Sequence, residues 1–204
     1  MKNKHTQKLL QKSRELFMKF GIKSLTMDDI ARELCISKKT IYQSVDNKAE
    51  LVEKVIQNYL EEEGTDLDTI YSKSGNAVEE IIAIIDYFIN RMREFNSTAV
   101  YDMKKHYPAA WELYNRYRFD SALRRVTENL QRGVSEGSYR PDINADAIAR
   151  IYIGGIDNLL NPEYFPVGEY QFLEIYKEYL NYHLRGIVTL NGLKILEANN
   201  LFKK

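Results

Sequence analysis

The sequence predicts an all-α protein. Only 4 prolines occur in 204 residues, apolar residues recur at helical spacing through most of the chain, and the alternation of apolar and polar residues typical of β-strands is not sustained. The chain is long enough to bury a sizeable core and to form two domains. We expect an N-terminal three-helix domain over residues 1–50 that contains a helix-turn-helix, and a C-terminal helical domain over residues 51–204.

The first helix of the helix-turn-helix is predicted to run from residue 27 to about residue 34. Thr26 and Asp29 form a capping-box pair, which satisfies free N–H groups at a helix start. Ile30 and Ala31 then lie on the inward face, and the small Ala31 lets a second helix cross closely at a steep angle.

A turn at Cys35 and Ile36 joins this helix to a second one, from residue 38 to about residue 44. Ser37 is positioned as its N-cap, and Ile41 is its inward residue. The other side presents five polar side chains that can hydrogen-bond to phosphate or to base edges. They are Lys38, Lys39, Thr40, Tyr42 and Gln43. A helix-turn-helix with such a face is a motif for reading DNA.

A third helix is predicted to begin at Lys48, where Asn47 with Glu50 repeats the capping pattern. The positive end of the helix dipole and a lysine coincide there, so a phosphate is favoured. We therefore expect Lys48 and Tyr42 to contact phosphate. The other expected DNA-binding residues are Thr26, Ser37, Thr40 and, better placed for base edges, Lys38, Lys39 and Gln43.

Charge is distributed unevenly along the chain, although its formal net charge is 0. Residues 1–50 hold 11 Lys or Arg and 6 Asp or Glu, a net charge of +5, whereas residues 51–204 hold 18 and 23, a net charge of −5. The zero total argues against indiscriminate binding to nucleic acid. The positive part contains the motif, and its charge supplies the salt-dependent attraction to phosphate on which DNA binding depends.

Together these positions resemble the TetR family of transcriptional repressors over residues 1–60. The resemblance is carried by a leading helix, Thr26, the Ile30–Ala31 pair, the pattern Ser37-x-x-Thr-Ile-Tyr and the pattern Asn47-Lys-x-x-Leu. It implies a transcriptional regulator that binds double-stranded operator DNA, as a repressor that a small-molecule inducer releases.

Two features depart from the family pattern. Ser44 and Val45 stand where the family usually has an aromatic pair, which removes one expected phosphate contact. Cys35 stands where the turn usually holds Gly, and a non-Gly residue in a left-handed conformation costs roughly 1–2 kcal/mol. Either the turn is built differently or Cys35 tolerates the strain. As the single cysteine, Cys35 is expected to be a buried, small apolar residue and not a redox sensor.

The C-terminal domain is predicted to be helical almost without interruption. The helix that leaves the motif has candidate breaks at Gly64 and at residues 72–76. Residues 81–92 carry the wide apolar stripe of a central helix. Pro108 ends one helix and begins a longer one, which is expected to run to about residue 136.

The last two long helices are expected at residues 144–160 and 169–188. Gly154 and Gly155 lie inside the first of them, and because each costs about 1 kcal/mol in a helix, we expect a close packing contact there. The family resemblance implies that these two helices form a four-helix bundle across a two-fold axis. A homodimer also follows from the short recognition helix, because a symmetric pair reads two half-sites about 34–36 Å apart or a multiple of it.

Aromatic side chains are concentrated in the C-terminal domain and suggest a pocket for an inducer of unknown identity. Its expected lining consists of Phe88, Tyr101, His106, Trp111, Tyr117 and Tyr152. An apolar cavity with a few hydroxyl groups suits a partly hydrophobic or aromatic ligand. The alternative is that these aromatic residues only fill a helical core.

The sequence gives no support for catalysis, a cofactor or a metal site. His5, His106 and His183 lie far apart without metal-ligand spacing, and neither a Gly-rich phosphate loop after a strand nor a nucleophile elbow is present. Neither a membrane-spanning apolar run nor a signal peptide is recognisable, so we expect a cytoplasmic protein. Two other classes stay open: an architectural or division-control protein of the same fold without an inducer, and a helical ligand carrier with a vestigial DNA-binding domain.

Overall fold

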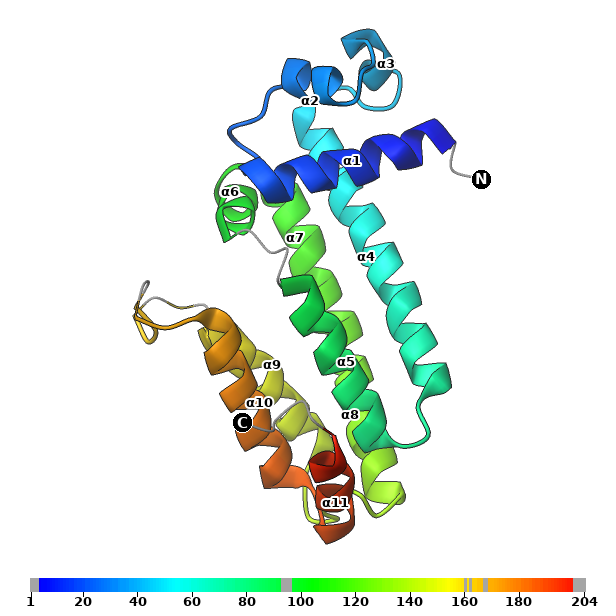
Figure 1. Ribbon diagram of the computed structural model, residues 1–204, viewed down its shortest axis with the longest axis vertical. Helices are drawn as coiled ribbons and strands as arrows, with labels where there is room; N and C mark the ends of the chain where they lie inside the picture. Colours follow the sequence, from blue (N-terminus) through cyan, green and yellow to red (C-terminus); the bar gives the residue numbers. More distant parts are fainter. Residues whose placement is uncertain (1–3, 93–96, 160, 162, 167–168, 200–204) are drawn as a thin grey trace. The chain divides into compact units, whose positions relative to one another are not determined.

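The structure is a computed structural model that describes residues 4–92, 97–159, 161, 163–166 and 169–199 (Figure 1). Within these residues the elements are α-helices, one π-helical segment and an isolated antiparallel bridge between Tyr139 and Val188. The predicted all-α class is therefore confirmed. None of the helices in the described ranges is long and apolar enough to cross a membrane.

The chain divides into two compact units. The first comprises Met1–Asp66 and Glu94–Arg118, and the second comprises Leu67–Arg93 and Phe119–Lys204. The first unit extends beyond residue 50 and includes a later segment of the chain. The division into compact units does not test whether residues 1–50 fold independently, so the domain boundary between residues 50 and 51 stays a prediction.

The first unit contains the helix-turn-helix and the helices that support it. They are α1 (Lys4–Phe20), α2 (Met27–Glu33), α3 (Lys38–Tyr42), the first part of α4 (Lys48–Lys73), α6 (Ser97–His106) and α7 (Pro108–Tyr117). One core joins these helices, and its buried members include Leu10, Phe17, Ile30, Ile41, Leu51, Ala99, Met103 and Ala110. As predicted, a helix begins at Pro108, where the missing N–H of proline leaves no hydrogen bond unmade.

The second unit is a helical body with its own core. It contains the end of α4 and the helices α5 (Ala77–Met92), η1 (Arg118–Ala122), α8 (Leu123–Ser135), α9 (Ala145–Leu159), α10 (Phe172–Ile187) and α11 (Leu190–Ala198). The π-helical η1 begins at Arg118, the last residue of the first unit. The buried members of the second unit's core include Val78, Ile85, Leu130, Tyr139, Tyr152, Tyr176, Leu180 and Leu184. The two expected long helices at residues 144–160 and 169–188 correspond to α9 and α10.

Three details differ from the sequence-based expectation. Gly64 does not break a helix, because α4 continues through it to Lys73. The recognition helix α3 ends at Tyr42 and not near residue 44, with Gln43 as its C-cap. A further helix, α11, follows Thr189, whose hydroxyl caps it by accepting from the Gly192 N–H; the sequence analysis did not predict this helix.

Candidate nucleic-acid interface

The entry into the helix-turn-helix is fixed by the predicted capping box. Thr26 Oγ1 accepts from the Asp29 N–H at 3.1 Å, and the Thr26 N–H donates to Asp29 Oδ2 at 2.9 Å. The side-chain and backbone hydrogen bonds from Thr26 hold the pKa of Asp29 below its usual value. Ile30 is fully buried and Ala31 is buried, so α2 presents the inward face expected from its sequence.

The turn between α2 and α3 is a left-handed C-terminal motif centred on Cys35. Cys35 has φ 54°, its N–H donates to the Arg32 carbonyl at 3.1 Å, and the Ile36 N–H donates to the Ala31 carbonyl at 3.0 Å. This is the hydrogen-bond pattern of a Schellman motif, which favours glycine at the left-handed position. Cys35 thus accepts the strain, and its side chain is exposed. The expectation that Cys35 is buried is wrong, because a side chain at this position of the turn points away from the helix pair.

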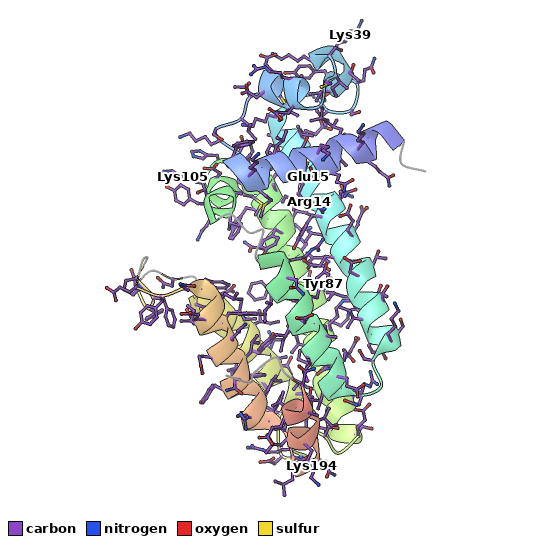
Figure 2. All side chains as sticks on the ribbon, in the orientation of Figure 1. Arg14, Glu15, Lys39, Tyr87, Lys105 and Lys194 are labelled. Carbon is purple, nitrogen blue, oxygen red and sulfur yellow. The ribbon has the colours of Figure 1, made fainter. Side chains whose placement is uncertain are left out.

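The recognition helix α3 presents the polar face that its sequence predicts. Ser37 Oγ accepts from the Thr40 N–H at 3.0 Å, which confirms the N-cap, and Ile41 is fully buried. All five polar side chains on the other side are exposed, namely Lys38, Lys39, Thr40, Tyr42 and Gln43. Figure 2 shows Lys39 projecting from α3 at the tip of the first unit. These side chains are free of the core and accessible to a ligand as large as a DNA duplex.

Lys38 has a partner on the neighbouring helix. Its ammonium lies 3.0 Å from Asp28 Oδ2, and this hydrogen bond raises the pKa of Lys38. Both side chains are exposed, so the pair contributes little stability and can be exchanged for a DNA contact. Lys38 therefore remains charged and available.

The departures at Ser44 and Val45 have a structural explanation. Val45 is buried and packs in the core of the first unit. The Ser44 carbonyl accepts from Lys54 Nζ at 2.6 Å, which ties the end of the recognition segment to α4. Val45, in place of an aromatic residue, thus packs in the core, and the helix-turn-helix stays intact without the aromatic pair.

The start of α4 confirms the predicted cap and reveals a role that the sequence did not suggest. Asn47 Oδ1 accepts from the Glu50 N–H at 3.0 Å, but the Glu50 carboxylate accepts from the Asp46 N–H and not from that of Asn47. The Lys48 ammonium donates to the carbonyls of Ile22, at 2.6 Å, and Leu25. Lys48 is half-buried, and this burial lowers the pKa of its ammonium. That Lys48 contacts phosphate stays a prediction; in this structure it holds the loop between α1 and α2.

The six residues expected to line an inducer pocket are distributed over both units. In the first unit, Tyr101 and His106 are exposed on α6, whereas Trp111 and Tyr117 are half-buried on α7. The Tyr101 hydroxyl accepts from the exposed Lys105, whose pKa it raises. An exposed side chain lines no buried cavity within its own unit, so neither unit by itself brings all six together.

The other two expected pocket residues belong to the second unit. Phe88 is half-buried on α5, and Tyr152 is buried on α9. The Tyr152 ring lies 4.8 Å from the His183 ring and 6.1 Å from the Tyr179 ring. This aromatic cluster was not recognised from the sequence, although Tyr179 and His183 are one helical turn apart on α10. The pocket itself stays a prediction.

A capped helix-turn-helix with an exposed polar recognition face, attached to a helical body, defines a DNA-binding transcriptional regulator. Residues 9–55 match the family described as bacterial regulatory proteins, tetR family. The chain is 25% identical to the HTH-type transcriptional repressor KstR2 of Mycolicibacterium smegmatis over 193 residues. This alignment covers 91% of this chain and 92% of that protein. The chain is also 27% identical over 145 residues to the uncharacterized HTH-type transcriptional regulator YvaF of Bacillus subtilis, covering 69% and 74% of the two chains.

Solved structures agree with this fold. A TetR-family transcriptional regulator from Agrobacterium tumefaciens superposes with a TM-score of 0.71 at 20% identity, covering 90% of this chain and 97% of that one. A regulator from Saccharomonospora viridis, solved in complex with choline, superposes with a TM-score of 0.75 at 18% identity, covering 91% and 98%. Residues 9–55 thus match the DNA-binding part of the TetR family, and the whole chain has the fold of the solved TetR-family regulators.

Proposed function

We propose that the protein is a repressor that a small molecule releases from its operator. The exposed polar face of α3 is the observation that carries DNA binding, because all five of its polar side chains are accessible while Ile41 anchors the helix in the core. The relative from Mycolicibacterium smegmatis is named a repressor, which supports repression here. A regulator of bacterial DNA acts where the chromosome lies, so we place the protein in the cytoplasm.

A small-molecule inducer is the second part of the proposal. The solved regulator from Saccharomonospora viridis contains choline, which supports a ligand-binding role for the helical body of this chain. Such a ligand would act by preferring a conformation whose recognition helices are spaced wrongly for DNA. Moving an equilibrium from 1:99 to 99:1 needs about 5.5 kcal/mol of differential binding, which two sites of a dimer could share.

The dimer that this mechanism needs is proposed to form through α9 and α10. Ile151 and Tyr182, on these two helices, are 61% and 81% exposed. At Gly154 and Gly186 no atom of the described residues, apart from the adjoining backbone of the same helix, lies within 4 Å of the position that a Cβ would occupy. Exposed apolar side chains next to small residues fit a second helix pair that approaches closely, and exposed apolar surface of this kind is typical of an interface.

The proposal is tested by footprinting the DNA that flanks the protein's own gene, with and without a panel of metabolites. Trp111 is the only tryptophan, so a change in fluorescence can be assigned to its position on α7. A ligand that releases DNA and perturbs this fluorescence supports an inducible repressor. Specific binding that no ligand reverses favours the architectural or division-control alternative, and a lack of specific binding favours the ligand carrier.

Base recognition is tested with Lys39→Ala. Lys39 is exposed at the tip of α3, so the variant should lose roughly 1–3 kcal/mol of discrimination at one base position and keep its affinity for random DNA within a small factor. Lys194→Ala is the matched control, because it removes an exposed lysine of α11 (Figure 2). Binding to a set of single-base operator variants is the measurement. Unchanged sequence preference in Lys39→Ala would show that α3 is docked differently.

A further inference from the structure

The loop between α1 and α2, residues 21–25, is held by a carboxylate from α6. The Lys23 backbone N–H donates to Asp102 Oδ2 at 2.8 Å, although the two residues are 79 positions apart in sequence. A Cβ at Gly21 would lie 3.2 Å from the same oxygen, so the carboxylate also lies close to the backbone at the start of the loop. The loop leads directly into Thr26, the N-cap of α2. The position of the loop therefore determines where the helix-turn-helix begins.

Asp102 is buried in the first unit, with only 5% of its surface exposed. Ala99 and Met103, its neighbours on α6, belong to the same core as the inward residues of α1, α2 and α3. A buried carboxylate is costly unless it is hydrogen-bonded or faces a positive charge. The bond to Lys23 satisfies this requirement, so the burial of Asp102 depends on its contact with the loop.

The positive charge that faces Asp102 comes from α4. The Lys48 ammonium donates to the carbonyls of Ile22 and Leu25, on either side of the residue that Asp102 binds. Burial lowers the pKa of Lys48, and the negative charge of Asp102 opposes this lowering. The Tyr107 ring lies 5.9 Å from Lys48 Nζ. The pKa of Tyr107 is raised, mainly by burial and also by the negative charge of Asp102. One acidic and one basic side chain thus hold the loop, each from a different helix.

We propose that Asp102 is a positioning residue for DNA binding. It holds the loop before α2 in the arrangement in which α3 reads DNA. This inference rests on the proposed function and adds to it a buried contact that positions the helix-turn-helix. Asp102 itself does not contact DNA in this scheme.

The test uses operator duplexes that the wild-type protein selects from random DNA. Asp102→Ala and Asp102→Leu both remove the acceptor, and leucine also fills the buried volume, whereas Asp102→Asn keeps an acceptor oxygen. Because the Lys23 N–H loses a charged acceptor, the first two variants should bind the selected duplex about 10-fold more weakly, and the Asn variant should stay within about 3-fold of wild type. Affinity for random duplexes should not change, since the polar face of α3 is intact.

Glu112→Gln is the matched control. It removes an exposed carboxylate of α7 that pairs with Arg116 at 2.9 Å, and it changes the charge as Asp102→Asn does. Circular dichroism identifies which variants are folded. Amide hydrogen exchange on the wild-type protein adds a measurement that needs no variant: the Lys23 N–H should be protected, and this protection should be lost in folded Asp102→Leu.

Three results would overturn the inference: wild-type operator affinity in a folded variant without the acceptor, an Asn variant as weak as the Leu variant, or an unprotected Lys23 amide in the wild type. If the wild-type protein selects no DNA sequence at all, the proposed function itself is rejected, and the inference about Asp102 is rejected with it. Weak operator binding by the Ala and Leu variants, with rescue by Asn and unchanged binding to random DNA, supports it.

Discussion

At the scale of single residues, the adjacent glycines of α9 have different surroundings. A Cβ at Gly155 would lie 2.2 Å from the Tyr179 hydroxyl. A Cβ at Gly154 would meet no atom of the described residues within 4 Å other than the adjoining backbone of its own helix. The Tyr179 hydroxyl donates to the Tyr152 carbonyl at 2.8 Å, so it cannot withdraw without losing that bond. The close packing predicted from the sequence is therefore confirmed for Gly155. Gly154 leaves open space on an exposed face.

Gly155→Ala should lower the free energy of unfolding by about 1–3 kcal/mol, because the added methyl group displaces a packed tyrosine. Gly64→Ala provides the comparison, inside α4 and outside the proposed dimer helices. Its Cβ would lie 3.6 Å from the Tyr117 hydroxyl, an ordinary contact, and it gains helix propensity of up to about 1 kcal/mol. Urea unfolding of both variants measures the difference. Equal stability of the two would contradict the packing described for Tyr179.

At the scale of elements, the sequence predicted helices best where local signals coincide. Caps at Thr26, Ser37 and Asn47 marked the helix starts correctly because each is a short-range hydrogen bond. Gly64 was wrongly taken as a break, since its cost of about 1 kcal/mol is small beside the packing of a long helix. The contacts of Lys48 and Asp102 with the α1–α2 loop could not be predicted, because they join residues that only the tertiary fold brings together.

The pairing of α9 with α10 should make stability depend on pH. Burial beside Tyr152 and Tyr179 lowers the pKa of His183 to about 4 from its usual 6.5. The unfolded chain therefore binds a proton between these values while the folded chain does not, so this contribution to stability is present above pH 6.5 and is lost as the pH falls towards 4.

Thermal unfolding of wild type and His183→Phe across pH 4–7 checks this expectation. The variant keeps an aromatic ring and removes the titrating group, so its melting temperature should fall less between pH 6.5 and pH 4. His106→Phe is the control, because His106 is exposed on α6. Parallel curves for wild type and His183→Phe would show that His183 does not contribute.

At the scale of the whole molecule, the proposed dimer is tested with Ile151→Asp. Ile151 is 61% exposed, so a charge there should leave the fold intact and separate the subunits. Ile156, on the same helix, is a poorer choice because it packs against the core of its own unit. Sedimentation should show a wild-type dimer at micromolar concentration and a variant monomer with weak operator affinity. A wild-type monomer would contradict the proposed dimer.

The exposed thiol in the turn of the helix-turn-helix makes the proposed change in spacing between the two motifs measurable. Cys35 is the single cysteine of the chain and its side chain is exposed, so a nitroxide label attaches at one known place without any substitution. A dimer then carries two labels, one on each DNA-reading motif. Pulsed electron resonance would give the separation between the motifs in the free, DNA-bound and ligand-bound protein. The label at the left-handed turn thus measures the change in spacing that the proposed mechanism of induction requires.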